Sequence, residues 1–101
     1  MATLRYDRLP PHLRGAVYRY VEFGVLPGDF LTAVLSNDLR EACARADDIN
    51  RYLLFDIVSW LYNDAPLLCW GNSANIRDWL KCQAASRRTA TPEELARYGD
   101  S

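Results

Sequence analysis

The sequence predicts an all-α fold, a compact single-domain bundle of about five helices. Apolar residues recur at intervals of three and four along most of the chain, which is the spacing of one helix face. Capping residues, glycines and prolines separate these stretches, and no segment alternates apolar and polar residues as an exposed strand does. We assign residues 1–84 to the helical domain and residues 85–101 to a linker and a short C-terminal helix.

The first helix is expected at residues 11–23, because two prolines precede it and proline favours the first turn of a helix. Gly24 suits the left-handed conformation that ends many helices. A second, short helix is expected at residues 29–35, where Asp29 lies near the start and favours the positive end of the helix dipole.

The residues at 36–38, Ser-Asn-Asp, are typical of a helix boundary and predict a break after the second helix. The next helix is then expected at residues 38–45. Its spacing places Leu39, Ala42 and Cys43 on the side that faces the core.

Residues 47–63 give the strongest helix prediction in the chain. Asp47 or Asp48 can cap its start, and its apolar residues occupy more than one side. These are Ile49, Leu53, Leu54, Phe55, Ile57, Val58, Trp60, Leu61 and Tyr62. A helix that is apolar on several sides is usually buried, so we expect this one to be the central helix of the bundle.

After Asp64, Ala65 and Pro66 end the long helix, Ser73 is expected to cap a further helix that runs to about residue 84. Residues 85–90 are small and basic, as in a linker. Thr91 followed by Pro92 and two glutamates predicts a last helix at residues 92–98. We expect Trp60 and Trp79 in the core.

Composition excludes several classes of protein. The chain has 12 basic and 13 acidic residues, a balance that argues against non-specific nucleic-acid binding. No apolar run approaches the length of a membrane span, and the first residues lack the apolar segment of a secretion signal. Three cysteines at long spacings suit reduced, buried and inert thiols. These features predict a cytoplasmic protein without membrane contact.

No pattern for catalysis or metal binding is present in the sequence. His12 is the only histidine, and no pair of histidine or cysteine residues has the close spacing of metal ligands. Acidic and amide residues at 37–38 and 47–50 lack the spacing of a calcium loop, and helix capping explains them. We therefore predict no catalytic residue, no cofactor and no metal.

Charge and aromatic residues point instead to a partner-binding surface. Eight carboxylate residues between positions 22 and 64 outnumber three arginines, while arginines dominate before position 20. An acidic surface can dock on a basic one, and exposed tyrosine or tryptophan often anchors an interface. We expect Trp70 or one of the N-terminal tyrosines to be partly exposed. The predicted partner-binding residues are Asp38, Glu41, Asp47, Asp48, Tyr18 and Trp70.

Several short strings, taken together, resemble a family of short uncharacterised proteins encoded by bacteriophages and prophages. They are LP at 9–10, PGDFLTAVL at 27–35, NDL at 37–39, ADDIN at 46–50, WLYN at 60–63 and CWG at 69–71. The resemblance covers about residues 6–80 and brings no catalytic residue with it. It implies a viral accessory protein in the cytoplasm of a bacterial host.

The leading hypothesis is a non-enzymatic phage or prophage accessory protein that binds a host or viral protein. An inhibitor of a CRISPR-type or other defence system is one form that the resemblance suggests. The alternative is a small nucleic-acid-binding regulator in which residues 38–45 and the helix after Asp47 form a helix-turn-helix, with Asn50 and Arg51 as contacts. A third interpretation is a hydrolase that uses Cys69 or Cys82.

Overall fold

Helices account for most of the chain, and their boundaries follow the capping residues closely. The computed structural model describes residues 6–86 and 89–98, and within these residues it contains six α-helices and no strand. Two short 3-10 turns precede the first α-helix, and a third joins the fourth α-helix to the fifth. The elements are η1 (Tyr6–Arg8), η2 (Pro11–Leu13), α1 (Arg14–Phe23), α2 (Asp29–Leu35), α3 (Leu39–Arg45), α4 (Asp48–Asn63), η3 (Leu67–Cys69), α5 (Ser73–Ser86) and α6 (Pro92–Tyr98). The predicted all-α, single-domain fold is confirmed.

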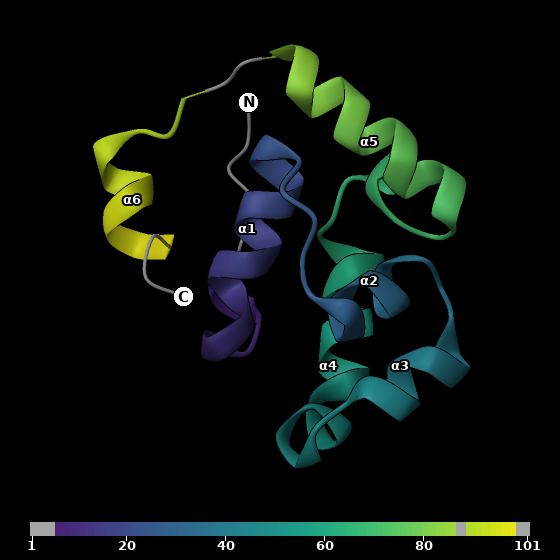
Figure 1. Cartoon of the computed structure of the whole chain (residues 1–101). Coiled ribbons are helices and arrows are strands. Elements are labelled where there is room, and N and C mark those ends of the chain that lie inside the picture. Colours follow the sequence, from purple (N-terminus) through teal and green to yellow (C-terminus); the bar gives the residue numbers. More distant parts are fainter. Residues whose placement is uncertain (1–5, 87–88, 99–101) are drawn as a thin grey trace.

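Helix α1 lies in the middle of the molecule. Helix α6 runs beside it on one side, α5 crosses its carboxyl end, and α2, α3 and α4 lie on the opposite side from α6 (Figure 1). Four side chains of α1 are buried almost completely, namely those of Val17, Tyr18, Tyr20 and Val21. They contact a core to which every other element except α6 contributes a buried residue within the described part of the chain. The helix that the fold surrounds is therefore α1.

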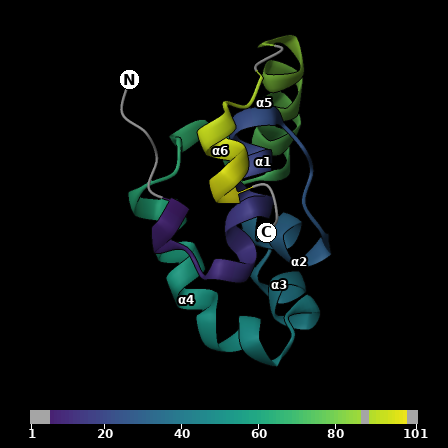
Figure 2. The ribbon, with the colours of Figure 1, turned by 90° about the vertical axis from the view of Figure 1, so that its left-hand side faces the viewer.

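Helix α4 confirms the predicted helix at 47–63 but not its predicted central position. It runs along one edge of the molecule (Figure 2) and turns Ile57, Trp60 and Leu61 toward the core. Its opposite side leaves Tyr52 and Phe55 exposed. A chain of this size forms one layer of helices around α1, and within the described residues no second layer covers the outer side of α4. An apolar sequence pattern shows which sides of a helix are hydrophobic, but it does not show whether another helix packs against each side.

Helix α3 is also less buried than its pattern suggests. Only Ala42 lies in the core, at 1 % exposure, whereas Leu39 and Cys43 are exposed. Helix α3 packs against α2, and Ala42 is the residue that it turns into the core. The break before α3 is as predicted: Asn37 adopts φ 62°, and asparagine tolerates this left-handed region well.

Two boundaries near the C-terminal end differ from the prediction. The side chain of Asn72, not of Ser73, caps α5 by accepting a 2.8 Å hydrogen bond from the Asn75 amide. Helix α5 continues to Ser86, so the expected linker at 85–90 begins later, and residues 87–88 lie outside the described residues. Thr91 caps α6 as predicted, since its hydroxyl accepts from the amide of Glu94 at 3.2 Å.

The carboxyl end of α1 is held against α5 by a close approach and three hydrogen bonds. The indole Nε1 of Trp79 donates to the carbonyl oxygens of Val21 at 3.1 Å and Tyr20 at 3.3 Å, and the Gln83 amide also donates to Val21. Gly24 ends α1 with φ 69°, as the sequence predicted. A Cβ atom there would lie 2.8 Å from the Cβ of Gln83. Glycine is therefore required both by backbone conformation and by space.

Gly24→Ala should lower the free energy of unfolding by about 2 kcal/mol or more, because left-handed backbone costs an L-residue about 1–2 kcal/mol and the new methyl group also meets Gln83. Gly28→Ala is the matched control: its φ is −67° and no atom lies within 4 Å of the added Cβ. Urea denaturation of both variants measures the difference. Equal, small losses would contradict the close approach of α1 and α5.

Candidate partner-binding surface

The carboxylates of Asp38 and Asp47 serve as helix caps. Asp38 accepts a 3.1 Å hydrogen bond from the Glu41 amide at the start of α3, and Asp47 accepts a 2.7 Å bond from the Asn50 amide at the start of α4. Each bond satisfies one of the amides that a helix start leaves without a partner. Both side chains are exposed, but their position is explained by the local backbone.

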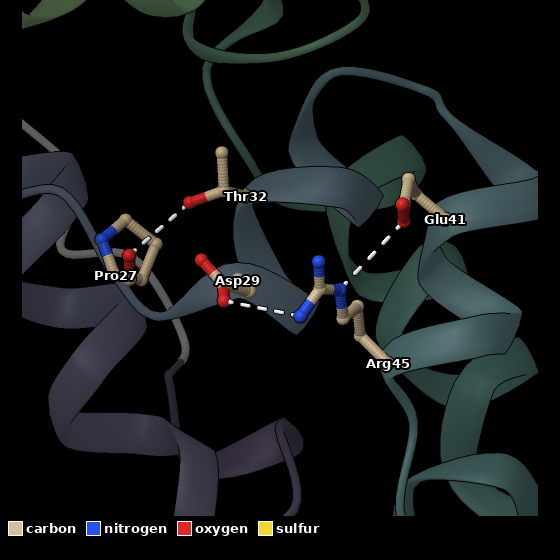
Figure 3. A network of polar contacts seen from close by, with 5 residues as sticks. All are labelled: Pro27, Asp29, Thr32, Glu41 and Arg45. Atoms are coloured by element: carbon tan, nitrogen blue, oxygen red, sulfur yellow. Dashed lines mark hydrogen bonds and ion pairs between the residues drawn. The ribbon is translucent and has the colours of Figure 1, made fainter.

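The other predicted carboxylates are paired with arginines. Arg45 lies between Asp29 at 3.5 Å and Glu41 at 3.7 Å, so it links α3 to the start of α2 (Figure 3). Asp48 lies 3.6 Å from Arg51 one turn further along α4. All these side chains are at least half exposed, and such pairs contribute little to stability. The arginines nevertheless offset the acidic charge, so this surface is not the concentrated acidic patch that charge counting suggested.

The structure separates the two predicted aromatic residues. Tyr18 is buried at 2 % exposure, with its ring 5.6 Å from that of Tyr6 and 5.5 Å from that of Phe23, both edge to face. The prediction of Tyr18 as a surface residue is wrong, because α1 is surrounded by other elements. Trp70 is half-buried, in agreement with its expected partial exposure, and Trp79 is half-buried as well. Trp60 is in the core as predicted.

Among the described residues, the largest exposed aromatic surface lies on α4, where the apolar pattern predicts burial. Tyr52, Phe55 and Tyr62 are 90 %, 81 % and 80 % exposed, and Val58 is 37 % exposed. Steps of three and four residues place these side chains along one side of the helix. We call Tyr52, Phe55, Val58 and Tyr62 the aromatic face of α4.

The opposite side of the same helix is anchored in the core, and this fixes the orientation of the aromatic face. Ile57, Trp60 and Leu61 are almost fully buried, and the ring of Trp60 lies 5.4 Å from that of Tyr6. The sequence did contain the signal: apolar residues on two opposite sides predict two contact surfaces. Only the structure shows which side faces the core.

Two further apolar side chains are exposed in η3, the turn that follows α4 in the chain. Leu67 and Leu68 in η3 are 82 % and 69 % exposed. A fully exposed aromatic side chain presents about 150–250 Å² for burial, so the three rings alone offer several hundred Å². Patches of this size on a monomer usually mark an interaction site.

A polar groove of about 600 Å³ borders α4 on the side of the N-terminal turns. Asp56, Asn63 and Asp64 line one wall, while Arg8 and Arg14 are among the residues of the other. The Arg14 guanidinium is held by hydrogen bonds to backbone carbonyl oxygens, 2.9 Å to Leu9 and 2.7 Å to Asp7. The groove therefore carries both signs of charge, as the polar rim of a protein interface does.

His12 and Cys69, which were candidates for catalysis, have contacts that stabilise the fold. His12 Nε2 lies 2.8 Å from Asn50 Oδ1, which joins the N-terminal turns to the start of α4. Cys69 is completely buried, its carbonyl accepts a 2.6 Å bond from the Tyr20 hydroxyl, and burial raises the pKa of its thiol to about 12. Within residues 6–86 and 89–98 no group of three or more histidine, cysteine or acidic residues is arranged to hold a metal ion.

Only Cys69 fulfils the expectation of buried thiols. All three cysteines are free, and Cys43 and Cys82 are exposed on α3 and α5. Both helices turn one side to the core and the other to the surface, so the prediction is wrong for these two residues.

Comparison of the chain with protein-family models, curated proteins and solved structures found no match. The resemblance to phage and prophage proteins therefore stays a prediction. Among the described helices, none combines the length and the apolar character that crossing a membrane requires.

Asp47→Ala should lower the free energy of unfolding by about 1 kcal/mol, because the Asn50 amide loses its capping acceptor. Asp48→Ala is the matched control, since that side chain is 98 % exposed and forms only a surface ion pair. Thermal and urea unfolding compare the two variants. If Asp48→Ala proved the more damaging change, the capping role of Asp47 would be refuted.

Native-state alkylation should separate the three thiols. Cys43 and Cys82 are exposed and should react with iodoacetamide quickly, whereas Cys69 should react only as the protein unfolds. Its pKa, raised from about 9 to about 12 by burial, lowers the thiolate fraction at neutral pH by roughly a thousandfold. Mass spectrometry of peptides after timed labelling measures each site. Fast labelling of Cys69 in the folded protein would restore it as a candidate nucleophile.

Proposed function

We propose that this chain is a non-enzymatic protein-binding module and that the aromatic face of α4 is its docking surface. The observation that carries the proposal is the exposure of Tyr52, Phe55 and Tyr62 on a helix whose other side is anchored in the core. Nothing in the fold of the described residues uses these rings. Burying them against a partner removes apolar surface from water and supplies the driving force for association.

The anchoring of α4 in the core favours specific binding over non-specific hydrophobic association. Asp47 caps the start of the helix, and Ile57, Trp60 and Leu61 fix its orientation from the core side. A rigid helix loses little conformational entropy on binding, and aromatic side chains have few rotatable bonds. Tyrosine is also among the residues that contribute most to interface energy.

The proposal keeps the predicted kind of partner, a host or viral protein, and moves the binding surface. Asp48 still borders the aromatic face at the start of α4, whereas Asp38, Glu41 and Asp47 have the local roles described above. The narrower prediction of an inhibitor of a defence system rests on the family resemblance alone. Trp70, half-buried in the turn before α5, is not needed by the proposal.

The nucleic-acid alternative has no observation in its favour. Of its two predicted contacts, Asn50 is buried and bonded to His12, and Arg51 is paired with Asp48. The outward side of α4 presents aromatic rings, where a recognition helix presents donors and acceptors to base edges.

Site-specific photo-crosslinking in bacterial cells tests the docking surface. A photoreactive phenylalanine analogue replaces Tyr52, which points to solvent at 90 % exposure, and a matched variant carries it in place of Lys81, exposed on α5. We expect a discrete protein adduct from position 52 and none of comparable yield from position 81, because only the aromatic face is in lasting contact with a partner.

A second change makes the test specific to the aromatic face. Adding Phe55→Ser to the position-52 variant should remove most of the adduct, while circular dichroism and the unfolding midpoint stay near those of the parent, because Phe55 is 81 % exposed. Equal adduct yields from positions 52 and 81, or an adduct insensitive to Phe55→Ser, would refute the proposal.

A further inference from the structure

Two pairs of positions on the outer side of α4 are spaced symmetrically about Ile57, and one pair consists of two tyrosines. Tyr52 and Tyr62 lie five residues to either side of Ile57, and Phe55 and Ser59 lie two residues to either side. The intervals are therefore three, four and three, which is the spacing of the seam between two antiparallel or parallel packed helices. A two-fold axis passing near Ile57 would bring each of these side chains onto its counterpart in an identical helix.

We propose that the partner docked on the aromatic face is a second copy of this chain, with the two α4 helices antiparallel across that axis. The inference rests on the proposed function, since it names the occupant of the same surface. In this arrangement Tyr52 of one copy packs beside Tyr62 of the other. Phe55 meets Ser59 of the second copy, so a large side chain faces a small one, as interdigitating packing requires.

The available area fits a stable dimer. A standard interface buries about 800 Å² on each partner. Tyr52, Phe55 and Tyr62 supply several hundred Å² at about 150–250 Å² for each ring, and Val58 adds to the same side. Leu67 and Leu68, which follow α4 in the chain, are also largely exposed.

Charge selects the antiparallel orientation. The aromatic face itself has no charged residue, but Asp48 and Arg51, 3.6 Å apart, lie at its amino end. An antiparallel pair keeps the Asp48–Arg51 ion pairs of the two copies at opposite ends of the seam, and it also opposes the two helix dipoles. A parallel pair would set Asp48 beside Asp48 and Arg51 beside Arg51 at one end of the seam and would align the dipoles, so it is disfavoured.

Sedimentation velocity over the micromolar concentration range tests self-association. We expect the wild-type chain to sediment as a dimer that dissociates on dilution, and Phe55→Asp to sediment as a monomer throughout. Leu95→Asp is the matched control, because Leu95 is likewise exposed, at 57 %, but lies on α6. It should leave the dimer intact. Far-ultraviolet circular dichroism of both variants verifies that the helices are retained.

Disulfide trapping tests the orientation of the two helices. In a background with Cys43→Ser and Cys82→Ser, chains carrying Tyr52→Cys are mixed with differently tagged chains carrying Tyr62→Cys, and the mixture is oxidised mildly. The antiparallel pair predicts disulfides between unlike chains in large excess over disulfides between like chains. Predominant linkage between like chains would overturn the arrangement.

The outcomes distinguish this inference from the proposed function. A wild-type chain that is monomeric at every concentration, while the Tyr52 crosslinker still yields an adduct with another protein that Phe55→Ser abolishes, overturns the second copy as partner and leaves the docking surface standing. A monomeric chain with no face-specific adduct overturns both. An adduct of twice the chain mass, lost with Phe55→Asp, supports both.

Discussion

The carboxyl end of α1 is the constraint on which the rest of the fold depends. Its last carbonyl groups would be costly to bury without partners, and side chains from α5, a helix distant in sequence, bond to two of them. Gly24 permits this approach by presenting no side chain to Gln83. The hydroxyl of Tyr20 adds a buried bond to the Cys69 carbonyl just before α5. These contacts make α1 the axis around which the other helices pack.

A fold organised around α1 determines what α4 can do. Once α1 occupies the centre, α4 contributes to the core through one side only, chiefly by Ile57, Trp60 and Leu61. Within the described residues, α5 and α6 lie against α1, and α3 packs on α2 (Figures 1 and 2). The aromatic face thus follows from topology and composition together. Helix α4 has apolar residues on two opposite sides, and the described residues cover only the side that faces the core.

Local features of the fold could be predicted from the sequence, and tertiary placement could not. The break at Asn37, the stop at Gly24 and the cap at Asp47 follow from backbone conformation and hydrogen bonding within a few residues. Burial depends on neighbours far along the chain, so the sequence pattern predicts the wrong environments for Tyr18 and Phe55. Both are aromatic residues on apolar helices, and only the arrangement of helices decides which one water reaches.

Exposed aromatic residues indicate a binding surface of this protein better than the predicted acidic residues do. A carboxylate at a helix start has a local reason to be there, since it caps backbone amides, and its presence carries no information about a partner. The aromatic rings at positions 52 and 55 have no local structural role of this kind. They do not fill the core, and a polar side chain would interact with water more favourably at either position. Residues that the fold does not need are the better guide to binding. Association through the aromatic face would also stabilise the folded chain, since a partner that binds only the folded state shifts the unfolding equilibrium.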